Sequence, residues 1–250
     1  MKLTIDNHEI EARTGQTLLE LVRSLGLDTD RLSARPLAAK IAGETFTLNY
    51  VPVRLKEELD PSNPQRRAMA ASGGHVKLLH YSDNTGRDAY TRTVQFLLFL
   101  ALRQLYPGVT AKMNCTVGQG LYIQVPSPDF DAAKLKARVA ELIKEDIPLI
   151  RKRITTEQAM EYFLEDGQED KARLLRHRTA PWFDVYTHDD FADYYYGEMM
   201  PSTGYVTVWD IISVDGGFMF IFPNPQNPDE LASFNQMPNF FRVFNEGERW

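Results

Sequence analysis

Apolar and polar side chains alternate over residues 1–11, which is the pattern of a β-strand with one buried face. Asn7 and His8 interrupt the alternation and supply a turn, so this segment predicts a short hairpin. Two further extended stretches are expected near residues 37–42 and 45–51, with Gly43 in the turn between them.

A helix is expected between the hairpin and these two strands. Thr17 is followed three residues later by Glu20, the spacing of a capping box, and Gly26 marks the end of the helix. Its apolar face consists of Leu18, Leu21, Val22 and Leu25. Strands and a helix packed on one side of them within so short a segment indicate an α+β unit.

The segment 56–77 is rich in proline, glycine and small polar residues, which is typical of a loop between domains. We therefore predict a first domain over residues 1–62, a linker over 63–76 and a second domain over 77–250.

The second domain is predicted to begin with a helix from Arg92 to Leu105 whose apolar residues lie on all sides, as expected of a buried helix. An amphipathic helix over 131–144 follows two strands near 110–115 and 120–125. Further elements are expected in this order: a strand at 148–154, helices at 155–164 and 168–177, and strands at 183–186, 205–214 and 217–223. The fold class is therefore α+β throughout, a small domain followed by a larger one of antiparallel strands and helices.

The composition narrows the choice of environment and partner. A formal charge of −6 over 250 residues gives no general attraction to nucleic acid, so RNA binding would need a local basic patch. Cys115 is the only cysteine, which excludes an internal disulfide and fits a reducing compartment. The N-terminal residues alternate between apolar and polar and contain no continuous apolar region, so they are not expected to be a secretory signal. The longest apolar run, 96–102, is too short to span a membrane. We expect a cytoplasmic protein that does not engage membranes.

Two segments carry a resemblance to known families. Residues 1–60 resemble a TGS domain, the β-grasp module found at the front of threonyl-tRNA synthetase. The helix from Arg92 to Pro107, the sequence KMNCTVGQGLY from Lys112 and the sequence YYGEMMPSTG from Tyr195 resemble, in the same order, the editing-type second domain of that synthetase.

The resemblance also identifies what is missing. In the editing-type family, two histidines four residues apart and a cysteine and a histidine four residues apart converge in one pocket. The matching positions here are Arg92, Phe96, Tyr195 and Met199. Phenylalanine and methionine can neither transfer a proton nor replace imidazole on zinc. We therefore expect no hydrolysis of aminoacyl esters, no catalytic residue and no metal ligand in this chain.

These departures, the Pro-Ser-Thr-Gly turn at 201–204 and the closing segment 240–250 resemble the front of bacterial uridine kinases and phosphoribulokinase homologues, in which a TGS and synthetase-like region precedes a kinase domain. Kinases of that class need a Gly-x-x-x-x-Gly-Lys-Ser/Thr loop, which these residues lack. The resemblance thus implies that a kinase domain follows Trp250 in the parent chain. ATP and Mg²⁺ would bind in that domain, and no cofactor is expected here.

We predict that this chain is an accessory module with a ligand-binding cleft that does not cleave its ligand. The candidate ligand is a nucleoside or nucleotide. The candidate cleft residues are Arg92, Lys112, Asn114, Tyr122, Tyr195, Glu198, Ser202 and Thr203. Two alternatives remain: a tRNA- or RNA-binding module, or a divergent editing hydrolase that uses Glu198 or Cys115.

Each candidate feature also has a structural interpretation. Arg92 suits phosphate or carboxylate through its planar guanidinium, but it equally suits an ion pair with a neighbouring acid. Ser202 and Thr203 can present hydroxyls to a phosphate or simply form a turn. Basic residues at 151–153 and 171–178 suggest an RNA-facing patch, yet interspersed acids make surface ion pairs the simpler interpretation. His177 and His188 near several aspartates suggest a metal site, and a solvated acidic loop is the simpler account.

Overall fold

The computed structural model describes residues 1–53, 64–177, 180–235 and 241. Its contacts divide the chain into two compact units. Unit 1 combines residues 1–148 with the segment that starts at Gly197, and unit 2 is Leu149–Tyr196. Among the described residues, unit 1 contains two sheets and unit 2 contains one.

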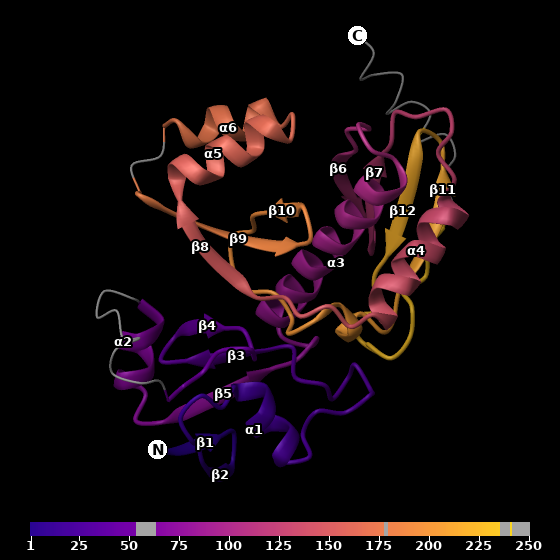
Figure 1. Ribbon diagram of the computed structural model, residues 1–250. Coiled ribbons are helices and arrows are strands. Elements are labelled where there is room, and N and C mark those ends of the chain that lie inside the picture. The colour runs from indigo at the N-terminus through magenta and orange to yellow at the C-terminus, as the bar shows by residue number, and fades with distance from the viewer. Residues whose placement is uncertain (54–63, 178–179, 236–240, 242–250) are drawn as a thin grey trace. The chain divides into compact units, whose positions relative to one another are not determined.

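The N-terminal part of unit 1 is a five-stranded β-grasp sheet with the strand order β2-β1-β5-β3-β4 (Figure 1). Its central strands β1 and β5 are parallel, with Thr4 beside His75, and the other neighbours are antiparallel. The elements are β1 (Lys2–Ile5), β2 (His8–Glu11), α1 (Leu18–Ser24), β3 (Ala38–Ile41), β4 (Glu44–Phe46), α2 (Pro64–Ala71) and β5 (His75–Leu79). This arrangement confirms the predicted α+β class.

Helix α1 begins directly after its N-cap residue, Thr17, as the capping box predicts. The Glu20 N–H donates to Thr17 Oγ1 at 3.1 Å, and the Thr17 N–H donates to Glu20 Oε2 at 2.7 Å. This capping box satisfies two backbone donors that a helix N-terminus otherwise leaves unpaired. The buried face of the helix closes one side of the sheet with apolar strand residues; the core includes Leu3, Ile5, Leu18, Leu21, Val22, Ile41, Phe46, Val76 and Leu78.

The prediction of a loop over 56–77 was wrong in two places. Residues 64–71 form α2, and His75 begins β5, which pairs with both β1 and β3. The pattern of β5 is short, and its place in the sheet depends on partner strands far away in the sequence. The rest of the predicted loop, 54–63, lies outside the described residues. The domain boundary at 63–76 stays a prediction.

The second part of unit 1 is an antiparallel sheet with the order β11-β12-β7-β6. Helices α3 and α4 lie against one of its faces in Figure 1. The elements are α3 (Asn84–Leu105), β6 (Lys112–Val117), β7 (Gly120–Gln124), α4 (Ala132–Lys144), the short 3-10 helix η2 (Thr203–Tyr205), β11 (Asp210–Val214) and β12 (Gly217–Ile221). Apolar residues surround α3, as predicted, and much of the helix is buried.

Unit 2 is a three-stranded antiparallel sheet with a pair of helices. The strand order is β10-β9-β8, and the elements are β8 (Arg151–Thr155), α5 (Thr156–Glu165), α6 (Glu169–Leu175), β9 (Trp182–His188) and β10 (Phe191–Asp193). A small apolar core holds the helices to the strands, with Phe163 and Phe183 at its centre. Thr155 caps α5 in a second capping box with Gln158.

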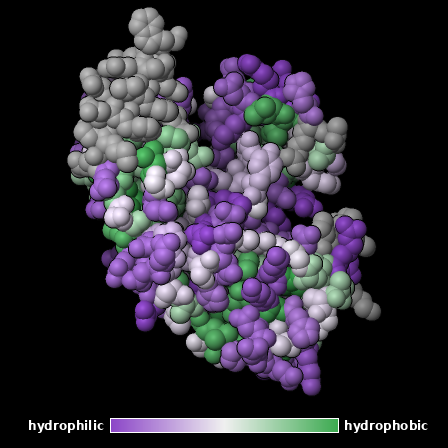
Figure 2. Space-filling view, turned by 180° about the vertical axis from the view of Figure 1, so that it is seen from behind, coloured by the Kyte–Doolittle hydropathy of each residue, from purple (hydrophilic) through white to green (hydrophobic). Residues whose placement is uncertain are grey.

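The outer surface is mainly polar on the face shown in Figure 2, where hydrophilic residues surround smaller hydrophobic areas. Within the described ranges, no helix is both long enough and apolar enough to cross a membrane. A partner that approaches this face therefore meets mainly polar side chains.

Candidate functional site

The candidate site in unit 1 lies where the chain after Gly197 runs along helix α3. We call this region the α3 seam; it consists of Arg92, Thr93 and Phe96 on the helix and residues 197–200 beside it. Arg92 and Phe96 are four residues apart and therefore lie on the same face of the helix.

Two hydrogen bonds fasten the segment to the helix. The backbone N–H of Met200 donates to Thr93 Oγ1 at 3.0 Å, and Arg92 Nη1 donates to the backbone carbonyl of Glu198 at 3.2 Å. The Thr93 hydroxyl in turn donates to the carbonyl of Ala89 at 2.9 Å. Because Thr93 is fully buried, these bonds hold the segment in a fixed register on α3. Thr93 was not among the predicted site residues, since a threonine inside an apolar helix gives no local signal of such a role.

Gly197 lets the guanidinium of Arg92 lie against the backbone. Its φ is +120°, and a Cβ added there would lie only 2.7 Å from Arg92 Cζ. No other residue type fits this position without a shift of the arginine. The only ion pair of Arg92 within the described residues is weak, since Asp88 Oδ2 is 3.9 Å from Arg92 Nη2 and the Asp88 side chain is mostly exposed. Its remaining N–H groups are therefore available to an anionic ligand.

The two apolar replacements in the seam fill space that polar side chains would need. Phe96 and Met199 both have an exposed fraction of 0%. The neighbouring Glu198 is 3% exposed, and its carboxylate accepts a hydrogen bond from Gln65 Nε2 at 2.8 Å. The seam thus contains a buried carboxylate held by an amide and two buried apolar side chains.

The hydroxyls of Ser202 and Thr203 serve the fold. Ser202 Oγ donates to the carboxylate of Asp146, which also accepts from the Gly204 N–H. Thr203 Oγ1 donates to the carbonyl of Leu142 at 2.7 Å and accepts from the Ile147 N–H at 2.8 Å. These bonds tie the turn to the end of α4, in line with the structural interpretation of this motif.

The candidates on strands β6 and β7 lie in different surroundings. Tyr122 is fully buried, packs against Phe241 and donates its hydroxyl to the carbonyl of Asp215 at 3.0 Å. Lys112 is exposed on β6. Asn114 lies on the same strand, and its side chain is outside the described part of the structure.

Tyr195 belongs to unit 2. Within that unit, its hydroxyl is 3.5 Å from Asp193 Oδ2. Burial, followed by the negative charge of Asp193, raises the pKa of Tyr195 well above its usual range. Asp193 is also paired with Lys171 at 2.6 Å. The tyrosine is therefore a neutral hydrogen-bonding group.

Three alternative interpretations can be compared with the geometry: a metal site, a nucleophilic cysteine and a basic patch. In the part of the chain that the structure describes, no group of three or more His, Cys, Asp or Glu side chains could hold a metal ion. Burial raises the pKa of the Cys115 thiol, which lowers the fraction of nucleophilic thiolate. Arg151 and Arg153 of the suggested basic patch share Asp184 as an ion-pair partner.

Comparison with known proteins gives a consistent set of relatives, although no protein-family model matches the chain. It is 28% identical to the threonine-tRNA ligase of Parabacteroides distasonis over 224 residues, which is 87% of this chain and 31% of the relative. The corresponding enzyme of Natranaerobius thermophilus is 27% identical over 87% of the chain and 32% of the relative. That of Symbiobacterium thermophilum is 25% identical over 82% and 29%.

Most of this chain is a threonyl-tRNA synthetase-like region. It spans about 30% of the length of the relatives that it matches. The synthetase part of the predicted resemblance is thereby supported. None of the relatives named here supports the uridine-kinase part of the prediction.

Proposed function

We propose that this synthetase-like chain is a tRNA-binding module that does not hydrolyse aminoacyl-tRNA. One observation carries the second half of this proposal. Phe96 and Met199, at positions where the resemblance places proton-handling side chains, are both fully buried in the α3 seam. A seam closed by two apolar side chains offers no general acid or base at those positions.

The first half rests on the relatives and on Arg92. The relatives are named as ligases of threonine and tRNA. Arg92 retains N–H donors beyond the one that holds the Glu198 carbonyl, and its side chain is 23% exposed. A guanidinium in this state suits a phosphate group, because its planar N–H pairs match two phosphate oxygens.

The test is a filter-binding titration of the chain with tRNA transcripts at several salt concentrations. Each phosphate contact contributes about 0.9 to the slope of log K against log salt. We expect Arg92→Gln to weaken binding and reduce the slope by about one contact. Arg138→Gln is the matched control, since Arg138 is committed to Glu141 and Glu145 on the surface of α4. Binding that is absent, or equally weakened by both variants, contradicts the proposal.

A deacylation assay on mischarged tRNA tests the absence of hydrolysis. We expect the chain to release amino acid no faster than buffer. Hydrolysis at an enzymatic rate that is lost in Glu198→Gln or Cys115→Ala would instead support the divergent-hydrolase alternative. The geometry disfavours that outcome for two reasons. The Glu198 carboxylate is buried and accepts a hydrogen bond from Gln65, and burial raises the pKa of the Cys115 thiol, which lowers the fraction of thiolate.

The finer prediction is that the chain is an accessory region of a uridine kinase-like enzyme in the cytoplasm. It requires a phosphate-binding loop encoded downstream of Trp250, with ATP and Mg²⁺ bound there. The proposal of tRNA binding has better support than the kinase prediction, because the relatives named above are all threonine-tRNA ligases. Sequencing the parent gene beyond this segment decides the kinase prediction directly.

A further inference from the structure

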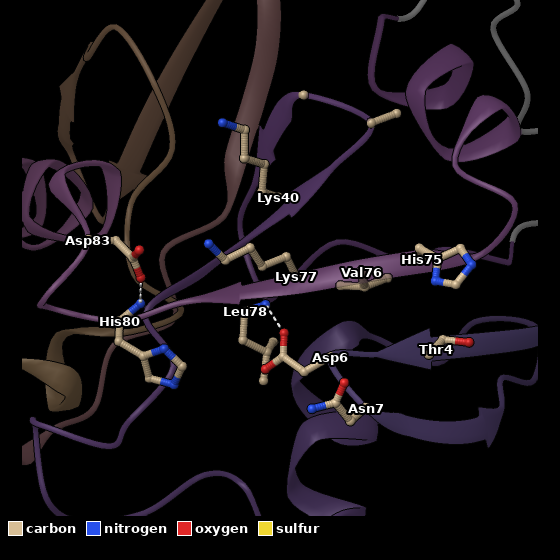
Figure 3. A pocket seen from close by; sticks show the side chains of 12 residues that line it. Thr4, Asp6, Asn7, Lys40, His75, Val76, Lys77, Leu78, His80 and Asp83 are labelled. Carbon is tan, nitrogen blue, oxygen red and sulfur yellow. Dashed lines mark hydrogen bonds between the residues drawn. The ribbon is translucent and has the colours of Figure 1, made fainter.

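An open cavity of about 670 Å³ lies over the β-grasp sheet, away from the α3 seam (Figure 3). It is lined by strands β1, β3 and β5 and by the residues that lead into α3, including Thr4, Asp6, Lys40, His75, Lys77 and Asp83. Its volume falls within the range of about 300–1,000 Å³ that is typical of small-molecule sites.

The strand pattern explains why this face is polar. On β5, Val76 and Leu78 are buried in the core beneath the sheet, so His75 and Lys77 point to the opposite side. On β3, Lys40 is likewise the exposed residue between buried neighbours. The cavity therefore lies on the face that α1 does not cover.

Lys40 and Lys77 form a pair of like charges at the centre of this face. They are directly opposite each other in the register of β3 and β5. Figure 3 shows both side chains extending toward the same side. Among the residues that the structure describes, neither ammonium group has an ion-pair or hydrogen-bond partner. Like charges in this position destabilise a sheet, so an anion between them would relieve the repulsion.

Two carboxylates border the lysine pair. Asp6 Oδ1 accepts from the Leu78 N–H at 2.9 Å, and Asp83 Oδ2 accepts from the His80 N–H at 2.8 Å. Each aspartate thus uses one oxygen to hold the backbone of β5 or of the following turn. The second oxygen of each can accept a hydrogen bond from a hydroxyl or amino group of a ligand.

We propose that this groove binds a small phosphorylated molecule that also carries hydroxyl or amino groups, with its phosphate between Lys40 and Lys77; nucleoside monophosphates serve as the probes of this class. The hydroxyl or amino groups of the ligand donate to Asp6 and Asp83. A long polyanion is the poorer fit, because the two carboxylates repel a phosphate chain that continues across the groove. This site is separate from the α3 seam, so it adds to the proposed function and does not depend on it.

The proposal is tested by calorimetric titration of the whole chain with uridine and adenosine 5′-monophosphates, the corresponding nucleosides and a short single-stranded oligoribonucleotide. We expect saturable binding of a monophosphate and binding of its nucleoside weaker by about tenfold or more, because the charge-assisted contacts are lost. Lys77→Gln and Lys40→Gln should each weaken the binding of the monophosphate by a similar factor. Lys134→Gln on the exposed side of α4 removes the same charge elsewhere and should leave binding unchanged.

Thermal unfolding of the same variants separates loss of binding from loss of fold. Because Lys77→Gln removes like-charge repulsion, its melting temperature should equal or exceed that of the parent. Three results overturn the proposal: no saturable binding of either monophosphate at millimolar concentration, equal weakening by Lys134→Gln, or binding of the oligoribonucleotide without binding of a monophosphate.

Discussion

Asp229 accepts hydrogen bonds from both the backbone N–H and the hydroxyl of Ser33, at 3.0 and 2.6 Å. Arg31 adds a charged donor to the same carboxylate at 2.8 Å. These contacts join the loop after α1 to the segment after β12, which are remote in the sequence. The bonds from Ser33, followed by that from Arg31, lower the pKa of Asp229 to about 2.

This lowered pKa predicts how acid affects an Asp229→Asn variant. A carboxylate with a folded pKa of about 2 and an unfolded pKa of about 3.9 stabilises the fold above the higher value and loses that effect as the pH falls through the lower one. At neutral pH the variant should therefore melt below the parent. The difference should shrink between about pH 4 and pH 2. Urea unfolding at several pH values measures it; a difference that is constant over this window contradicts the assignment.

Asp28 connects the same loop to η2. Its carboxylate accepts from Arg23, from Arg35 and from the Tyr205 hydroxyl, the last at 2.9 Å. Burial alone would raise the pKa of Asp28, but the three hydrogen bonds together outweigh it and the pKa is lowered. Asp28→Asn should cost about 2 kcal/mol of unfolding free energy, because it weakens charge-assisted bonds in a buried site.

Tyr205→Phe is the matched control for Asp28. It removes one neutral donor but keeps the ring, which lies 3.8 Å from the guanidinium carbon of Arg35. A smaller loss of about 1 kcal/mol is expected from denaturant unfolding. An equal or larger loss in Tyr205→Phe would place the main contribution on the tyrosine hydroxyl and not on the two ion pairs.

Gly197→Ala should disturb Arg92. The added Cβ would lie 2.7 Å from Arg92 Cζ, and the φ of +120° is unfavourable for alanine. We expect a loss of about 1–3 kcal/mol of unfolding free energy. The double variant with Arg92→Ala separates the two causes, because it removes the clash and keeps the backbone strain. If the double variant is no more stable than the sum of the single changes predicts, the clash contributes nothing.

Thr93 should be more sensitive to loss of its hydroxyl than to loss of its methyl group. Thr93→Val leaves the buried N–H of Met200 without its acceptor, which costs about 1–3 kcal/mol. Thr93→Ser keeps the bond and removes one methyl group, which costs about 1 kcal/mol. Equilibrium unfolding in urea compares the two; a larger loss in Thr93→Ser would show that packing, and not the hydrogen bond, holds residues 197–200 on α3.

The local elements of this protein follow from its sequence because each depends on residues that are close together in the chain. The alternation in residues 1–11 predicts the β1–β2 hairpin, and Thr17 with Glu20 predicts the start of α1. The same reasoning anticipates α4, whose N-cap is Asp131. Hydrophobic period and capping chemistry act over a few residues, so they need no knowledge of the partner strands.

The tertiary structure decided which of these residues meet. Whether His75–Leu79 is a linker or a central strand depends on β1 and β3, and the register that brings Lys40 opposite Lys77 exists only once those strands pair. The hydroxyls of Ser202 and Thr203 are engaged by residues of the α4 end that lie far from them in sequence. Long-range hydrogen bonds and strand register are set by packing of the whole unit, because the free energy of a pairing depends on both partners and on what covers them.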